Sequence, residues 1–169
     1  AWFKDNLFDP FFPWYLIEHR NKKQKFSSLP KISKQKNVEE YVKFVHVFSE
    51  GDKNLSKYSE IITSMMKVIL QKFKLNKLEI IRAKANLQTS NVRIKNNKHS
   101  SPHVDMNENH FVILYYVNNS DGETVLFKKN KIWKKITPKQ GRVLIFNGDI
   151  KHAAGCPVDN QVRAVININ

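Results

Sequence analysis

The clearest pattern along the chain is helical and lies between Leu55 and Phe73. Apolar residues recur there at intervals of three and four, as they do along one face of an amphipathic helix. We therefore predict one long helix over about residues 54–74, with its apolar stripe packed against a sheet. The stripe consists of Leu55, Tyr58, Ile61, Ile62, Met65, Met66, Ile69, Leu70 and Phe73.

The hydrophobic period changes to two after residue 77, and short β-rich runs then alternate with turn signals to the end. The runs NSDG (119–122) and TPKQG (137–141) are typical turn sequences. Many short strands after one long helix predict an α+β fold, an antiparallel sandwich or jelly roll backed by the helix. The predicted strands cover residues 41–48, 78–87, 103–105, 111–118, 123–128, 131–136, 142–147 and 162–168.

The length of 169 residues favours a single domain. We expect residues 1–77 to form an N-terminal supporting segment and residues 78–169 to form the jelly-roll core. If the apolar face of strand 78–87 packs on the helix, its polar face looks into the barrel. Asn86 would there hydrogen-bond a co-substrate or the substrate; a merely solvated face is the alternative. The apolar face holds Ile81, Ala83, Ala85 and Leu87, and the polar face holds Arg82, Lys84 and Asn86.

Composition adds a strong positive charge to this picture. The chain has 29 Lys and Arg against 15 Asp and Glu, a net charge of +14. Such a charge favours a nucleic-acid partner, but lysines accompanied by many asparagines are also what a biased codon usage produces. The single cysteine, Cys156, excludes an internal disulfide and a thiolate zinc site, and it indicates a reducing compartment.

Candidate chemistry begins with His103 and Asp105, which are two residues apart and would share one face of a strand. A third ligand-type residue, His152, follows the predicted strand 142–147. Two imidazoles and one carboxylate, presented from neighbouring strands, suit a six-coordinate divalent metal with three open positions. This ligand set is typical of non-haem Fe(II) oxygenases.

Arg163 is the one charged residue within the otherwise apolar strand 162–168. If its side chain points inward, burial of the guanidinium requires an anionic partner. Because a guanidinium pairs bidentately with a carboxylate, a dicarboxylate co-substrate is a natural occupant. A salt bridge at the sheet edge is the alternative.

Residues 78–169 resemble the Fe(II)/2-oxoglutarate-dependent dioxygenases, in particular the prolyl-4-hydroxylase-like branch and its small stand-alone bacterial or phage members. The resemblance implies a double-stranded β-helix (jelly roll) backed by the long helix and N-terminal elements. We expect a cytoplasmic protein, in the host cytoplasm if it is phage-encoded. The matching stretches are PHVD, FVILYYVNNSDGETVLF, ITPKQGRVLIFNGDIKHAAG and VRAVININ.

Carried over to this sequence, the resemblance makes His103, Asp105 and His152 the iron ligands and catalytic centre. It implies Fe(II) as the metal, 2-oxoglutarate and O2 as co-substrates, and ascorbate as an optional reductant. Arg163 would hold the distal carboxylate of 2-oxoglutarate, and the hydroxyl of Tyr116 would assist, while Tyr115 packs in the core. Asn167 lies on the same strand face as Arg163 and is a further candidate for 2-oxoglutarate binding, as is Asn86.

The resemblance implies hydroxylation of a prolyl or other residue of a peptide or protein, coupled to oxidative decarboxylation of 2-oxoglutarate, with no membrane partner. A nucleic-acid-modifying oxygenase of the demethylase type is the alternative with the same chemistry. A non-catalytic metal-binding jelly roll and a basic nucleic-acid-binding module are alternatives from other classes. Residues 128–142 carry seven Lys and Arg and no acid, and residues 78–104 carry five against one Glu, so an anionic substrate is favoured.

Overall fold

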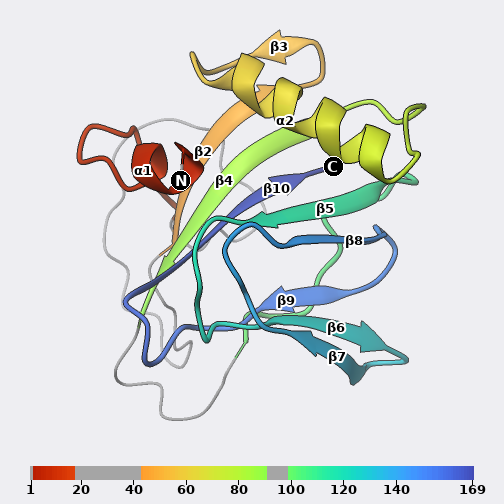
Figure 1. Ribbon diagram of the computed structural model, residues 1–169. Helices are drawn as coiled ribbons and strands as arrows, with labels where there is room; N and C mark the ends of the chain where they lie inside the picture. The colour runs from red at the N-terminus through yellow and green to blue at the C-terminus, as the bar shows by residue number, and fades with distance from the viewer. Residues whose placement is uncertain (1, 18–42, 91–98) are drawn as a thin grey trace.

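The computed structural model describes residues 2–17, 43–90 and 99–169, which form two facing β-sheets with a helix on the outer side of the larger one (Figure 1). The larger sheet has the order β1-β2-β4-β10-β5-β8, with β3 paired to β2, and the smaller has the order β7-β6-β9. The elements are α1 (Trp2–Leu7), β1 (Tyr15–Ile17), β2 (Lys43–Glu50), β3 (Lys53–Asn54), α2 (Ser59–Lys72), β4 (Arg82–Thr89), β5 (Phe111–Tyr116), β6 (Thr124–Lys128), β7 (Lys131–Ile136), β8 (Val143–Asn147), β9 (His152–Ala154) and β10 (Val162–Ile168).

This arrangement confirms the predicted α+β jelly roll backed by a helix. The strand pairings between the described elements are antiparallel, and the central strand β10 lies between β4 and β5. Alternate residues of the central strands of the larger sheet therefore face either α2 or the space between the sheets. Among the described residues, no helix has the length and apolar character needed to cross a membrane.

The main core lies between α2 and the outer face of the larger sheet. The buried helix residues Ile62, Met66 and Ile69 pack in one cluster with Ala83 and Ala85 of β4. Both alanines are fully buried, and their small side chains allow the helix to approach the sheet closely. Of the apolar face predicted for strand 78–87, Ala83, Ala85 and Leu87 thus pack on the helix side, whereas Ile81 is exposed and precedes β4, which begins only at Arg82. The polar residues of β4 face the interior between the sheets.

The helix is shorter than the predicted range of 54–74. Lys53 and Asn54 instead pair with β2 as the short strand β3, and α2 begins at Ser59. The Ser59 hydroxyl is 2.6 Å from the backbone oxygens of both Phe48 and Ser56, which ties the start of the helix to β2. Leu55 and Tyr58 match the helical spacing but lie outside the helix. They follow the hairpin of β2 and β3 and precede the first residue of α2.

His46 on β2 joins the N-terminal segment to the residues before α2. Its Nδ1 lies 2.9 Å from the carbonyl oxygen of Pro13, and its Nε2 lies 2.8 Å from the hydroxyl of Ser56. Because a carbonyl can only accept, Nδ1 carries the hydrogen and Nε2 accepts from Ser56, which makes the ring neutral. Burial lowers the pKa of His46, and the bond to Pro13 opposes this only in part.

The lowered pKa of His46 predicts a stability that falls on acidification. The unfolded chain takes up the proton near the ordinary histidine pKa, whereas the folded chain resists it to lower pH, so stability is lost between these two values. At pH 7.5, His46→Gln should lower the free energy of unfolding by about 1–2 kcal/mol through its lost hydrogen bonds. Urea unfolding at pH 7.5 and at pH 5.5 measures the difference in free energy of unfolding between wild type and His46→Gln. This difference should be smaller at pH 5.5. A difference that is the same at both pH values would contradict a neutral, buried His46 ring.

Candidate metal centre and co-substrate site

His103 and His152 are brought together by the backbone. The two residues form an antiparallel bridge, with the amide of each donating to the carbonyl of the other at 3.0 and 2.9 Å. Their ring centroids are 4.8 Å apart. The predicted strand 103–105 is reduced to this single bridge, and Asp105 follows it in a bend. Asp105 therefore meets the histidines through a turn of the chain and not through the alternation of a strand.

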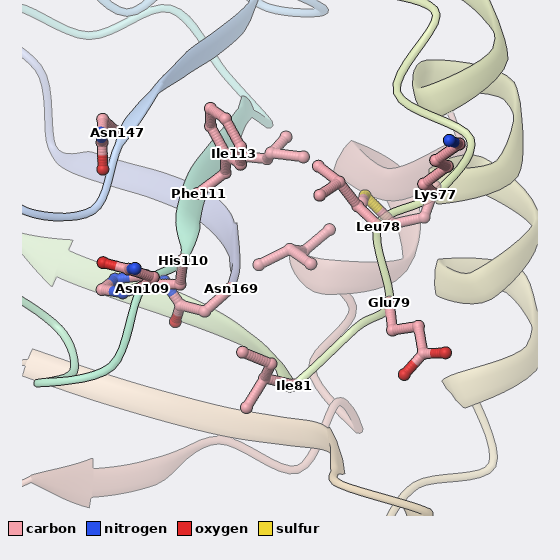
Figure 2. A pocket seen from close by; sticks show the side chains of 12 residues that line it. Lys77, Leu78, Glu79, Ile81, Asn109, His110, Phe111, Ile113, Asn147 and Asn169 are labelled. Carbon is pink, nitrogen blue, oxygen red and sulfur yellow. The ribbon is translucent and has the colours of Figure 1, made fainter.

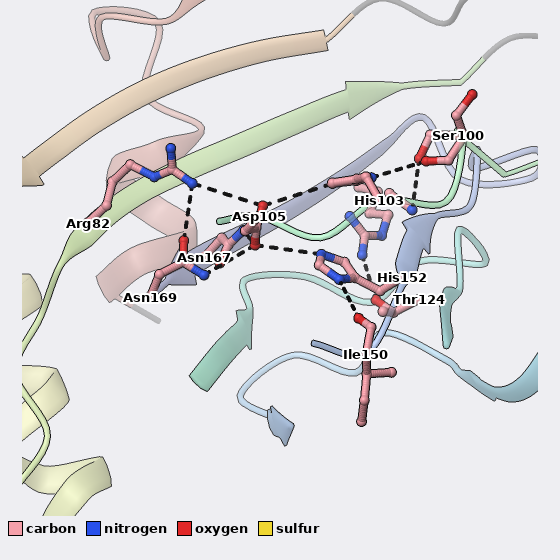
Figure 3. Close-up of polar contacts among 12 residues, drawn as sticks. Arg82, Ser100, His103, Asp105, Thr124, Ile150, His152, Asn167 and Asn169 are labelled. Atoms are coloured by element: carbon pink, nitrogen blue, oxygen red, sulfur yellow. Dashed lines mark hydrogen bonds and ion pairs between the residues drawn. The ribbon is translucent and has the colours of Figure 1, made fainter. Parts of the chain in front are cut away.

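The two imidazole rings present the same nitrogen to Asp105. The Nδ1 of His103 lies 3.1 Å from the carbonyl oxygen of Ser101, and that of His152 lies 3.3 Å from the carbonyl oxygen of Ile150. Nδ1 of each ring carries the hydrogen and donates it to the carbonyl. Nε2 therefore keeps the lone pair that can bind a metal ion. The Nε2 atoms lie 3.9 and 3.6 Å from Oδ1 and Oδ2 of Asp105, respectively (Figure 3).

Asp105 is held in place by amides at the end of β10. The side-chain amides of Asn167 and Asn169 donate to its Oδ2 at 3.0 and 3.2 Å (Figure 3). Burial alone would raise the pKa of Asp105. The neighbouring His152 ring, the hydrogen bond from Asn167 and the nearby charge of Lys84 instead hold this pKa well below its ordinary value. The carboxylate is therefore ionised at neutral pH.

These three side chains suit a divalent metal ion. One ligand atom from each of His103, Asp105 and His152 lies within 4.8 Å of the others. Burial lowers the pKa of His103, which favours its neutral, ligating form. Two imidazole lone pairs and a carboxylate that converge on one point repel one another, and a cation among them removes this repulsion. The side chains of Asp105 and His152 are 5% and 7% exposed and that of His103 is 51% exposed, so the cluster opens to solvent on the His103 side.

Arg163 occupies a second polar site between the sheets. Its side chain is buried, at 3% exposure. Its Nε donates to the carbonyl of Gly122 at 2.7 Å, Nη1 to Oε1 of Gln88 at 3.0 Å, and Nη2 to the hydroxyl of Thr124 at 2.7 Å. A Cβ at position 122 would meet the backbone oxygen of Gly155 at 2.8 Å and Cδ of Arg163 at 2.9 Å, so glycine leaves room for the Arg163 side chain. The position inside the barrel excludes the alternative of a salt bridge at the sheet edge.

Tyr116 lies in the same site as Arg163. Its hydroxyl donates to the Thr124 oxygen at 2.7 Å, and its ring centroid is 5.9 Å from Cζ of Arg163. Tyr116 is fully buried. Tyr115 points to the other face of β5 and packs in the helix-side core against Phe3, as the sequence predicts. The strand register explains why Tyr116, and not Tyr115, lies beside Arg163. Tyr116 pairs with Val165, which is on the same inner face of β10 as Arg163.

Two of the predicted 2-oxoglutarate residues lie elsewhere along the barrel. Asn167 shares a strand face with Arg163 but donates to Asp105, because four residues of extended strand separate them by about 13 Å. Asn86 faces the interior opposite Val165 and is half-buried. Sequence reasoning did not assign site contacts to Gln88, Thr124 or Asn169. The period of two on β4 and β10 could have found Gln88 and Asn169, whereas no sequence signal marks Thr124.

A cavity of about 530 Å³ is lined in part by Asn169, whose side-chain amide donates to Asp105, but not by the three clustered residues themselves (Figure 2). It is formed on the helix side of the larger sheet, between the segment after α2 and the start of β5. Met66, Ile113 and Ile168 line it, and all three belong to the helix-side core. His103, Asp105 and His152 do not line it, so this cavity is not where the cluster would act on a substrate.

Comparison with known proteins places the sequence in a family. Residues 87–169, about half of the chain, match the model of the 2OG-Fe(II) oxygenase superfamily, and this stretch contains the three clustered residues and Arg163. This part of the chain belongs to the superfamily. The superfamily is named for iron(II) and 2-oxoglutarate, the metal and co-substrate that the sequence predicts. No curated protein matches the chain significantly.

Two solved structures share the fold. A 2OG-Fe(II) oxygenase family oxidoreductase from Burkholderia pseudomallei is 14% identical with a TM-score of 0.59, and the match covers 76% of this chain and 66% of that protein. A prolyl hydroxylase from Trichoplax adhaerens, solved with a hypoxia inducible factor oxygen degradation domain peptide fragment, is 16% identical with a TM-score of 0.51. That match covers 75% of this chain and 61% of the hydroxylase. The chain thus spans just under two thirds of the length of either protein.

Proposed function

We propose that this chain is an Fe(II)/2-oxoglutarate-dependent oxygenase that hydroxylates a prolyl or other residue of a peptide or protein. The observation that carries the proposal is the cluster of His103, Asp105 and His152 in the same barrel as the buried Arg163. The overall reaction would be 2-oxoglutarate + O2 + R–H → succinate + CO2 + R–OH. One oxygen atom enters succinate and the other enters the product.

The residues divide into two sites with separate tasks. His103, Asp105 and His152 would hold the iron, which when bound supplies the activation of O2 that is coupled to decarboxylation of 2-oxoglutarate. Arg163 would bind the distal carboxylate of 2-oxoglutarate, and Tyr116 and Thr124 would complete that site with hydroxyl groups. Gln88 and Gly122 orient the guanidinium through their hydrogen bonds.

Two observations support a peptide as the substrate and one favours a nucleic acid. The resemblance to the prolyl-4-hydroxylase-like branch and the peptide bound to the Trichoplax adhaerens hydroxylase support a peptide. Trp133 on β7 favours the alternative, because it is 46% exposed and its ring is flanked by the ammonium groups of Lys128 and Lys134 at 5.7 and 4.7 Å. Such an exposed aromatic with cations suits stacking on a base.

A substrate screen tests the proposal and separates the two classes. Proline-containing peptides and methylated oligonucleotides would be incubated with the protein, Fe(II), 2-oxoglutarate and O2. We expect a peptide to gain one oxygen by mass spectrometry, with one succinate formed for each hydroxyl. Demethylation of an oligonucleotide with no peptide product would replace the peptide assignment, and no product from either class would contradict it.

Asn167 is proposed as a positioning residue for Asp105. Removal of its amide in Asn167→Ala takes one of two hydrogen bonds from Oδ2 and should lower the affinity for divalent metal by about tenfold. Titration of the protein with Mn(II), read by electron paramagnetic resonance, measures this without turnover. Asn118→Ala removes an amide that bonds to backbone away from the cluster and should leave metal affinity unchanged. Equal metal affinity in both variants would contradict the positioning role.

A further inference from the structure

The inner face of β4 carries a row of four polar side chains that runs between the two sites. The row consists of Arg82, Lys84, Asn86 and Gln88, while Ala83, Ala85 and Leu87 between them pack in the core under α2. In the register with β10, Gln88 lies opposite Arg163 and Lys84 lies opposite Asn167. One end of the row therefore contacts the Arg163 site, and the other end lies beside the metal-ligand cluster.

Lys84 is a half-buried cation beside Asp105. Its charge helps to lower the pKa of Asp105, and burial followed by the charge of Arg82 lowers the pKa of Lys84 itself. Within residues 2–17, 43–90 and 99–169, the structure gives its ammonium group no hydrogen bond and no ion pair within 4.0 Å. A half-buried ammonium without a close partner is costly, and an anion that binds beside it would remove that cost.

Arg82 provides a second cation at the same end of the row. Its Nη2 donates to Oδ1 of Asn169 at 3.3 Å and lies 4.0 Å from Oδ1 of Asp105 (Figure 3). Its Nε is buried and has no hydrogen-bond partner among the described residues. The guanidinium thus retains a donor for a further acceptor. The exposed Glu50 lies opposite Arg82 on β2, where solvent screens its charge.

The proposed co-substrate would use both of its carboxylates elsewhere. One carboxylate would bind Arg163, and the other end would lie at the metal-ligand cluster, because the reaction couples decarboxylation of 2-oxoglutarate to the metal. The ammonium of Lys84 and the Nε of Arg82 are therefore left for a second anion, and the open His103 side of the cluster gives it access from solvent.

We propose that Lys84 and Arg82 form an anion subsite for the substrate, which binds the carboxylate of an Asp or Glu close to the oxidised residue of a peptide. The inference rests on the proposed function and names its substrate class more closely: an acidic peptide. A peptide is favoured over a nucleic acid here because Trp133, the exposed aromatic flanked by lysines, lies on β7, and β6 separates β7 from the ligand-bearing β9. A base stacked on Trp133 would be on a different part of the barrel from Lys84.

A peptide library tests the subsite without turnover. Peptides with a fixed proline and randomised flanking residues would be bound to the protein with Mn(II) and 2-oxoglutarate in the absence of O2, and the bound fraction would be sequenced. We expect wild type to enrich Asp and Glu at a flanking position by about tenfold, the effect of one charge-assisted hydrogen bond. Lys67→Gln, which removes an exposed lysine from α2, should give the same enrichment.

Variants of Lys84 assign the preference to the subsite. Lys84→Gln should lose most of the acidic enrichment, and the charge reversal Lys84→Glu should shift the enrichment to Lys and Arg. The charge reversal also controls for misfolding. A Lys84→Glu protein that gains a preference for Lys and Arg must be folded, even if it is less stable than wild type. No acidic enrichment by wild type, or the same enrichment by Lys84→Glu, would overturn the subsite.

Two further results separate this inference from the proposed function. Fe(II)-dependent turnover of 2-oxoglutarate by wild type, together with a library that shows no charge preference, would reject the subsite and keep the oxygenase assignment. Absence of 2-oxoglutarate turnover would reject the proposed function itself. Binding of a random-sequence single-stranded oligonucleotide that Lys84→Gln weakens and Lys67→Gln does not, with no acidic peptide enriched, would overturn the acidic-peptide assignment.

Discussion

Asp105→Asn is expected to abolish Fe(II)-dependent turnover of 2-oxoglutarate, with a loss of at least about a thousandfold. Asp105 is the anionic member of the ligand cluster, and its neighbours keep it ionised. Asparagine has nearly the same shape but lacks the charge, and an amide nitrogen is not a metal ligand. We also expect metal affinity to fall by at least about a hundredfold, because the remaining imidazoles alone bind a hard divalent ion weakly.

The matched control for this prediction is Asp52→Asn, which removes an exposed carboxylate in the hairpin between β2 and β3. It should keep both turnover and metal affinity. Succinate formation measures turnover, and Mn(II) titration measures binding independently of activity. Succinate formation by Asp105→Asn at the wild-type rate would remove the basis for the metal centre.

Arg163→Met is expected to have the second large effect, on 2-oxoglutarate binding and on stability together. Loss of a bidentate, charge-assisted contact to the distal carboxylate should raise the KM for 2-oxoglutarate by about a hundredfold. Methionine also leaves Gln88, Thr124 and the Gly122 carbonyl without their buried donor. The free energy of unfolding should therefore fall by about 2–4 kcal/mol.

Two measurements separate binding from stability in this case. Addition of 2-oxoglutarate with Mn(II) should raise the melting temperature of wild type, because a ligand that binds only the folded state stabilises it. It should not raise that of Arg163→Met. Arg142→Met, which removes a guanidinium bonded to the backbone of Thr137, should keep the ligand-induced rise. An equal rise in all three proteins would mean that 2-oxoglutarate binds away from Arg163.

The sequence predicts the sheet strands well because their hydrophobic period is two. The runs 131–136 and 162–168 coincide with β7 and β10, and the alternation on β4 correctly separates a helix face from an interior face. The same alternation brings Arg163 and Tyr116 to one face. By contrast, β9 is only three residues long, too short for any period to be recognised, and it carries His152.

The internal geometry of the site is less accessible from the sequence. His103 and Asp105 are expected on one strand, but the structure has a single bridge at His103 and a bend at Asp105. That bridge pairs His103 with His152, and long-range pairing leaves no local signal. Asn167 illustrates a second limit, because a shared strand face fixes the direction of a side chain but not which of two sites along that face it reaches.

The most direct test of the oxygenase assignment is turnover of 2-oxoglutarate by the wild-type protein without added substrate. The protein would be incubated with 2-oxoglutarate labelled at the C1 carboxyl, the carbon that leaves as CO2. Labelled CO2 and unlabelled succinate would be measured with and without Fe(II) and with and without O2. We predict slow, equimolar release of CO2 and succinate that requires both Fe(II) and O2 and disappears in Asp105→Asn. Absence of release under every condition, or release that does not depend on Fe(II), would contradict the account.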